Sequence, residues 1–348
     1  MNAARSCLLP FLALVLTAAP DELRFAPDEG AAVTRTFREV TELDVERGVI
    51  DMAGEEEQLP DDFGLAVRTE RVVVLSDEYV AVSGGRPTRL KRTFDRIDLA
   101  LTVEESHSDE DDPQATDATG ASELEDLTAV FTWDDGEGQY GVAFEDDDGD
   151  EDLLAGLEED ADLRGFLPAG EVSEGDEWEV PLEALARVLR PGGDLLIELD
   201  LDDVEGEEAS VVFCSFWNAA ATAEELEGEV DARYAGLVEE DGRELARIEL
   251  AVKLRATREV LELARGILEA AGVDSEEVGM LDSMEVTYEL DGEGVLRWDR
   301  DAGRVAALRL EGDVVLTFAI SGEDEGESLR MELGFAGRTE LTLETERR

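Results

Sequence analysis

The chain has very little of the chemistry that most enzyme active sites use. Its 348 residues include a single histidine, His107, and two cysteines, Cys7 and Cys214. Because His107 falls in a polar tract that we expect to be disordered, catalytic triads, Cys–His dyads and multi-histidine zinc sites are excluded together. An active site made of two carboxylates, as in glycosidases, is compatible with this composition, but the sequence does not identify which two of its ninety acidic residues would form it. The sequence therefore predicts no catalytic and no cofactor-binding residue.

Long hydrophobic runs are also missing. The apolar run at residues 8–19 follows Arg5 and ends in the small residues Thr17, Ala18 and Ala19. It is shorter than the roughly 20 residues that cross a bilayer, and it is typical of a secretory signal. We therefore expect a signal peptide at residues 1–19 and an exported protein, either periplasmic, retained in the cell envelope or extracellular. An uncleaved anchor is the alternative, because Pro20 follows the cleavage site.

Removal of the signal would leave Cys214 as the only cysteine, so the mature chain could form no internal disulfide. Its fold must then depend on a hydrophobic core, which a chain of this length can build. Cys214 lies in an apolar run and is expected to be buried as a small hydrophobic residue.

Positive charge is scarce. Thirty basic residues, of which only Lys91 and Lys253 are lysines, oppose ninety acidic ones, and the net charge is −60. Such a charge repels nucleic acid and anionic membrane surfaces, so neither is an expected partner. It also destabilises the compact state by self-repulsion unless salt or bound cations screen it.

Calcium is the cation to consider, because acids gather after residue 144. The candidate ligands are Asp146, Asp148, Asp150 and Asp152. An EF-hand alignment on Gly149 fails at both ends, since Phe144 and Ala155 would occupy its first and last ligand positions. A solvated acidic turn is the alternative interpretation.

Alternation of apolar and polar residues dominates the rest of the chain and indicates β-strands. Residues 246–256 show it most clearly, with Ile248, Leu250, Val252 and Leu254 on one face. Further strands are predicted at residues 33–45, 65–75, 78–83, 89–103, 127–133, 314–320 and 329–335, and Leu341 and Leu343 continue this last pattern to the end of the chain. Gly-Gly or Asp-Gly pairs, which suit tight turns, lie at residues 83–85, 135–136, 241–242 and 291–292.

Helices are predicted at three places: residues 181–189, residues 258–271 and, more weakly, residues 151–164. The acidic tract at residues 104–122 lacks apolar periodicity and is predicted to be a disordered loop. The fold class is therefore α+β and mainly β, with antiparallel sheets or a meander and two or three short helices packed on them. We divide the mature chain into a β-rich N-terminal part, residues 20–216, and a C-terminal meander, residues 217–348.

Two short motifs suggest nucleotide chemistry but lack the surroundings that it needs. Residues 136–141 match G-x-G-x-x-G, yet a block of acids follows where a helix should receive a phosphate, so we predict a hairpin. Residues 187–193 resemble a stretch of methyltransferases that use S-adenosylmethionine. The glycine-rich loop and the alternating β/α pattern of that family are missing, so a helix end is the better interpretation.

A third set of short motifs carries a resemblance over most of the mature chain. It consists of Leu167-Pro168, Val172, Gly175-Asp176 and Trp178, together with Gly85-Arg86-Pro87 and residues 90–95. In these the chain resembles exported bacterial β-rich proteins to which no activity is assigned, so the resemblance implies export and a β-rich fold alone. Physically, Gly-Asp-x-Trp predicts a turn that places Trp178 on a core.

Three functions stay open. The first is a non-enzymatic envelope or secreted protein that binds an apolar ligand or a partner surface, since curved sheets enclose hydrophobic pockets. The second is a calcium-dependent acidic structural protein. The third is a carboxylate-based hydrolase, which requires two acids facing each other in a cleft, one with a raised pKa.

Overall fold

The computed structural model describes residues 20–348 except residues 53, 61–62, 107–113, 147–148, 201–225, 263, 266–280 and 325–326. The expected signal peptide, His107, Cys214, Asp148 and half of the expected helix at 258–271 lie outside the described residues. Within them, no helix is long and apolar enough to cross a membrane.

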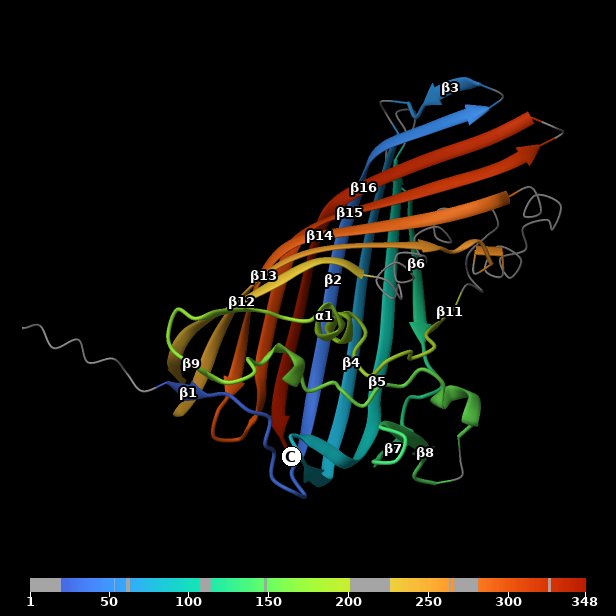
Figure 1. The fold of residues 1–348 in the computed structure, drawn as a ribbon. Coiled ribbons are helices and arrows are strands. Elements are labelled where there is room, and N and C mark those ends of the chain that lie inside the picture. The colour runs from blue at the N-terminus through green and yellow to red at the C-terminus, as the bar shows by residue number, and fades with distance from the viewer. Residues whose placement is uncertain are drawn as a thin grey trace, which may run out of the picture.

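One antiparallel sheet of 14 strands forms the body of the protein (Figure 1). Its main path runs β10-β12-β13-β14-β15-β16-β2-β4-β5-β6-β11. β3 extends the sheet beside β2, and the β7–β8 hairpin extends it beside β5. The strands of the N-terminal part are β2 (Ala32–Met52), β3 (Glu55–Gln58), β4 (Gly64–Ser83), β5 (Arg86–Ser106), β6 (Gln114–Ala121), β7 (Thr128–Asp134) and β8 (Gln139–Phe144).

The C-terminal part supplies a meander of five long strands. These are β12 (Leu226–Glu240), β13 (Arg243–Glu259), β14 (Leu281–Asp299), β15 (Arg304–Asp324) and β16 (Glu327–Arg347). The short strands β10 (Glu177–Glu179) and β11 (Glu198–Asp200) form the two ends of the path. Because β16 pairs with β2 from Arg347 to Leu329, the two parts of the chain share one continuous sheet.

The sheet is bent, and its inner face carries a layer of short elements that follow β8 (Figure 1). These include the 3-10 turns η1 (Glu151–Leu154) and η2 (Arg164–Phe166) and the helix α1 (Leu182–Leu189). A small second sheet pairs β1 (Asp21–Glu22) with β9 (Glu171–Val172). The core lies between the inner face and this layer, and it includes the fully buried Trp298, Tyr234 and Phe94.

Glycines allow neighbouring strands to approach closely where the sheet bends. Gly292 on β14 is opposite Gly312 on β15. A Cβ atom on Gly312 would lie 2.7 Å from the carbonyl oxygen of Asp291 and 2.7 Å from the Cα of Gly292. Any larger residue at position 312 must therefore displace backbone.

The local predictions succeed for most strands and for three turns, of which the one at residues 135–136 joins β7 to β8. Ile248, Leu250, Val252 and Leu254 are all buried, as the alternation predicts. Positive φ angles occur at Gly84 and Gly85 between β4 and β5, and at Asp241 and Gly242 between β12 and β13. Residues 136–141 belong to the β7–β8 hairpin and open no helix.

Four predictions are wrong. Residues 291–292 form no turn but lie inside β14, where close packing requires glycine. β6 occupies residues 114–121 of the tract expected to be disordered, because β5 supplies a pairing partner for a polar strand. The expected helix at 151–164 is replaced by η1 and η2. The expected strands at 65–75 and 78–83 are one strand, β4.

The expected count of two or three helices is also higher than the structure shows. Of the described residues, α1 is the one helix of eight residues, and residues 261–262 and 264–265 begin another helical segment. The coarser prediction of a mainly antiparallel β protein is confirmed.

Candidate functional site

An acidic loop crosses the inner face of the sheet beside α1. We define it as residues 157–164, which contain Glu158, Glu159, Asp160 and Asp162. Glu159, Asp160 and Asp162 are buried although they are charged residues. Burial of carboxylates is costly unless cations pair with them, so the surrounding arginines decide how this loop is held.

A fully buried arginine of the sheet, Arg92, holds the backbone of the acidic loop, and a second, Arg35, shares its carboxylate partner. Arg92 on β5 donates to the carbonyl oxygens of Glu158 at 2.7 Å and Glu159 at 2.9 Å. Its Nε and Nη2 also donate to Asp77, its direct partner on β4, at 2.8 and 2.9 Å. Arg35 on β2 donates to the same carboxylate and to the hydroxyl of Tyr79. The trio Arg35–Asp77–Arg92 therefore forms a rigid floor under the loop.

Arg164 holds the side chains of its own loop. Its guanidinium donates to both carboxylate oxygens of Glu159, at 3.0 and 2.5 Å, and to Asp162 at 2.8 Å. The guanidinium carbon also lies 5.3 Å from the ring centre of Phe25, close enough for a cation–π contact.

The C-terminal half of α1 faces the loop with two further arginines. Arg187 donates to Asp160 at 2.9 Å, and Arg190 donates to Glu158 at 2.8 Å. Arg71 on β4 donates to the carbonyl oxygen of Leu189 in the last turn, where a helix leaves its carbonyls unpaired. The helix and the loop are thus fixed to each other and to the sheet.

Charges in this region balance, in contrast to the excess of acid elsewhere. Six arginines are connected to six carboxylates by hydrogen bonds or ion pairs: Arg35, Arg71, Arg92, Arg164, Arg187 and Arg190 with Glu39, Asp77, Glu158, Glu159, Asp160 and Asp162. Neutralisation makes the burial of so many charged groups tolerable.

The network shifts the pKa values of its two most buried acids in opposite directions. Burial opposes the ionisation of Asp77, but Arg92 and Arg35 outweigh burial and hold its pKa below the ordinary value. Burial raises the pKa of Asp162, and the neighbouring Asp160 and Glu159 raise it further against the attraction of Arg164.

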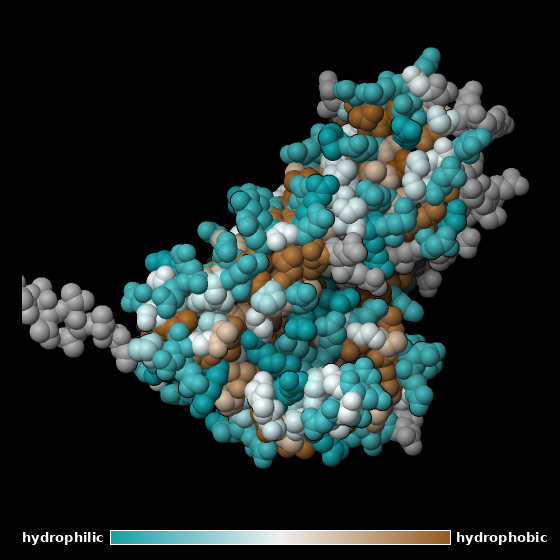
Figure 2. Space-filling view, viewed as in Figure 1, coloured by the Kyte–Doolittle hydropathy of each residue, from teal (hydrophilic) through white to brown (hydrophobic). Residues whose placement is uncertain are grey.

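A cleft of about 840 Å³ opens above this network, between α1, the acidic loop, β8 and the start of β12. One part of its lining is apolar and includes Val142, Leu157, Leu182 and Leu226. The charged part consists of Glu158, Glu159, Asp160, Glu183, Glu227, Arg164, Arg187 and Arg190. Figure 2 shows that this face of the molecule is largely hydrophilic around α1, with apolar residues in separate patches. The volume is in the range of small-molecule sites.

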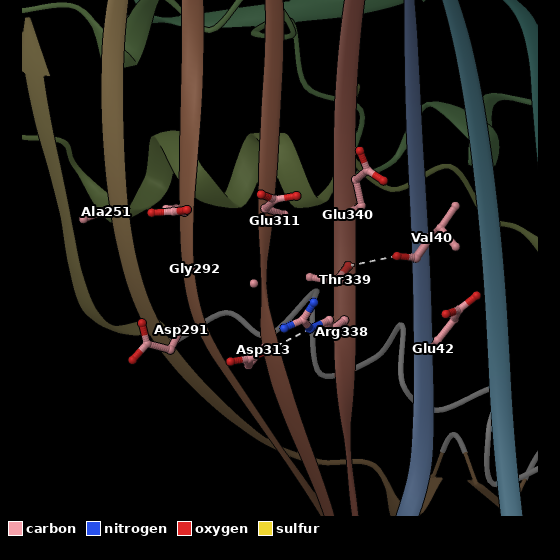
Figure 3. A pocket seen from close by; sticks show the side chains of 12 residues that line it. Val40, Glu42, Ala251, Asp291, Gly292, Glu311, Asp313, Arg338, Thr339 and Glu340 are labelled. Carbon is pink, nitrogen blue, oxygen red and sulfur yellow. Dashed lines mark hydrogen bonds and ion pairs between the residues drawn. The ribbon is translucent and has the colours of Figure 1, made fainter. Parts of the chain in front are cut away.

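A second hollow, of about 700 Å³, lies on the outer face of the sheet, over β14, β15, β16 and β2 (Figure 3). Glu293, Glu311 and Glu340 are direct neighbours on β14, β15 and β16, and Arg309 pairs with the last two at 3.2 and 3.0 Å. The ion pair of Arg338 with Asp313 is well exposed. Exposed pairs of this kind contribute little to stability, and this surface is an acidic face of the sheet.

Of the four candidate calcium ligands, Asp146, Asp150 and Asp152 belong to the described residues and Asp148 lies outside them. Asp150 accepts a hydrogen bond from the backbone N–H of Asp152 and so caps η1. Asp146 lies in the bend that follows β8. Nowhere in the described part of the chain do three histidine, cysteine or acidic side chains group as metal ligands.

The Gly-Asp-x-Trp motif forms the turn that its sequence predicts. Gly175 has a φ of 95°, and Asp176 accepts a hydrogen bond from the N–H of Ser173 at 2.8 Å. Trp178 is half-buried against the core, and its indole donates to the carbonyl oxygen of Phe166 at 3.0 Å. This motif therefore positions η2, at the end of the acidic loop.

Sequence reasoning missed the arginine network, although a signal for it exists. Arg35, Asp77 and Arg92 occupy positions in phase with the apolar faces of their strands, between Val33 and Phe37 on β2 and between Leu90 and Phe94 on β5. A charged residue at such a position must be buried with a partner. The pattern marks the residues but does not name the partners.

A scan against protein-family models finds no match, and a search of curated proteins finds no similar sequence.

Proposed function

We propose that this chain is an exported, non-enzymatic binding protein, and that its ligand occupies the cleft between α1 and the acidic loop. The observation that carries the proposal is the construction of this cleft. Its walls are fixed by buried arginines of two strands, Arg92 on β5 and Arg71 on β4, so its shape is set before any ligand arrives. A preorganised site loses less entropy on binding.

The pairing of the carboxylates in the acidic loop favours binding over hydrolysis. Glu158, Glu159 and Asp160 line the cleft, and each accepts a hydrogen bond from an arginine. The acid with the raised pKa, Asp162, is only 2% exposed and does not line the cleft.

The apolar wall indicates the size and character of the ligand. Leu182 and Ala186 on α1, Leu226 on β12 and Val142 on β8 offer apolar surface beside the charged wall. A ligand with an apolar body and a polar end would cover both walls. This modifies the sequence-based expectation of a purely apolar ligand, since the lining contains eight charged side chains.

Native mass spectrometry of the protein purified from its own source tests the proposal. We expect an additional mass of small-molecule size that disappears on denaturation. Ala186→Phe places a ring in the cleft and should abolish the additional mass. Ala251→Phe, on the exposed outer face of β13, is the matched control and should retain it. An additional mass that persists in Ala186→Phe would place the ligand elsewhere and refute the proposed site.

A further inference from the structure

Asp160 has an acceptor that the network leaves without a partner. Its Oδ2 accepts from Arg187 at 2.9 Å and lies 3.8 Å from Arg164. Its Oδ1 is buried, and no donor among the described residues reaches it. The residue is only 8% exposed, and it belongs to the wall of the cleft. A buried carboxylate oxygen without a hydrogen bond is costly, so this atom calls for a donor from outside the protein.

The charge of the lining indicates the kind of donor. Five acids and three arginines line the cleft, which leaves a net charge of −2. The surplus comes from Glu183 on α1 and Glu227 on β12, both exposed and without an ion pair in the described part of the structure. The whole chain, at −60, adds to the attraction for cations.

We propose that the cleft binds a small organic amine, with its apolar body against Leu182 and Leu226 and its ammonium group donating to Oδ1 of Asp160, which a rotation of that side chain turns from its buried position into the cleft. This inference rests on the proposed function and specifies the chemical class of its ligand. An ammonium group supplies three donors and a positive charge, and its hydrogen bond to a carboxylate is of the strong, charge-assisted kind.

A metal ion fits the cleft less well than an amine. Glu158 and Glu159 already accept hydrogen bonds from Arg190 and Arg164, so Asp160 offers one unengaged oxygen where a metal ion needs several. The apolar wall also has no role for a bare ion, whereas it suits the hydrocarbon part of an amine.

The experiment compares three probes of equal length, hexylammonium, hexanol and hexanoate, by titration calorimetry and NMR shift mapping at neutral pH. About 0.15 M salt reduces the diffuse attraction of cations to the acidic surface, because screening acts within about 8 Å. We expect hexylammonium to bind at least about tenfold more tightly than hexanol, with shifts at α1 and the acidic loop, and hexanoate to bind least.

Asp160→Asn tests the assigned atom. The amide keeps the size of the carboxylate and removes its charge, so hexylammonium should lose about tenfold or more in affinity while hexanol is unaffected. The control is Asp313→Asn, which removes one charge from the outer acidic face and should change the affinity less than about twofold. Thermal melts verify that both variants fold. If Asp160→Asn does not fold, the comparison of the three probes and the Ala186→Phe variant still decide the question.

The outcomes separate this inference from the proposed function. Equal binding of hexylammonium and hexanol in the cleft, or unchanged affinity in Asp160→Asn, would refute the amine while keeping a binding cleft. A co-purified ligand that contains no amine would do the same, and Oδ1 would then be satisfied by a buried water molecule. If none of the three probes causes an NMR shift at α1, the proposal that the ligand is an amine is refuted. If, in addition, no ligand co-purifies with the protein, the proposed binding function is refuted as well.

Discussion

Replacing Arg92 by methionine tests whether the buried network holds the inner face together. The substitution keeps a long apolar stem but removes four hydrogen bonds: two to Asp77 and two to the carbonyl oxygens of Glu158 and Glu159. The two carbonyls lose these partners, and Asp77 is left with Arg35 alone. Breaking a buried pair by removing one partner costs about 3–5 kcal/mol.

The expected effect is large enough to measure by thermal and urea unfolding. For the roughly 270 described residues the unfolding entropy near the melting temperature is about 0.6 kcal/mol per kelvin. A loss of about 3–5 kcal/mol therefore lowers the melting temperature by about 5–9 °C. Arg68→Met is the matched control, since Arg68 lies on the outer face of β4 and its ion pairs are exposed. Its cost should be below about 1 kcal/mol.

Two further measurements test whether Arg92→Met destabilises the protein through the loss of its ion pair with Asp77. The double variant Arg92→Met with Asp77→Asn should cost less than the sum of the single variants by about 0.5–3 kcal/mol, because the residues share one interaction. In the parent protein the lowered pKa of Asp77 contributes stability above the unfolded value of about 3.9, and that contribution is lost as pH falls below it. The variant should lose less stability on acidification. A cost for Arg92→Met equal to that of Arg68→Met would refute the reasoning.

Three other predictions concern single positions. Asp162→Asn should flatten the pH dependence of the free energy of unfolding. In the parent protein the raised pKa of Asp162 makes the fold less stable as pH rises above about 3.9, the pKa of an aspartate in the unfolded chain. The loss is about 1.4 kcal/mol per pH unit while the carboxyl group remains protonated in the fold. Gly312→Ala should destabilise by about 1–3 kcal/mol in urea unfolding, because its Cβ would meet backbone, whereas Gly170→Ala meets nothing within 4 Å and should be neutral. Phe25→Ala should cost about 3–5 kcal/mol in the same assay, because the ring is 6% exposed and packs edge-on against Tyr79.

Each of these predictions has an opposing result. An unchanged pH profile in Asp162→Asn would mean that the carboxyl group is ionised in the fold at neutral pH. A neutral Gly312→Ala would show that the strands can separate at the bend. A mild effect of Phe25→Ala would mean that the segment after Pro20 is not part of the core.

The sequence by itself determined the local features of this protein. Alternation in residues 246–256 set which side chains of β13 are buried, because a strand places successive residues on opposite faces. Gly84-Gly85 and Asp241-Gly242 determine the turns of the β4–β5 and β12–β13 hairpins, because tight turns need positive φ angles. Leu182 to Leu189 set α1, with Pro181 before it.

Tertiary structure decided everything that depends on pairing between distant segments. β2 and β16 lie at opposite ends of the chain and pair along most of their lengths. Asp291-Gly292 has the composition of a turn but continues a strand, because β13 and β15 pair with it on both sides. Alternation fixes the face of a side chain, but it says nothing about which strand lies beside it.

The candidate site belongs wholly to this second category. Glu158, Glu159 and Asp160 are three of ninety acids in the sequence, and no local feature distinguishes them. They become a defined wall because Arg92, Arg187 and Arg190 reach them from β5 and α1. A buried charge is tolerated only beside its partner, and only the folded chain brings those partners together.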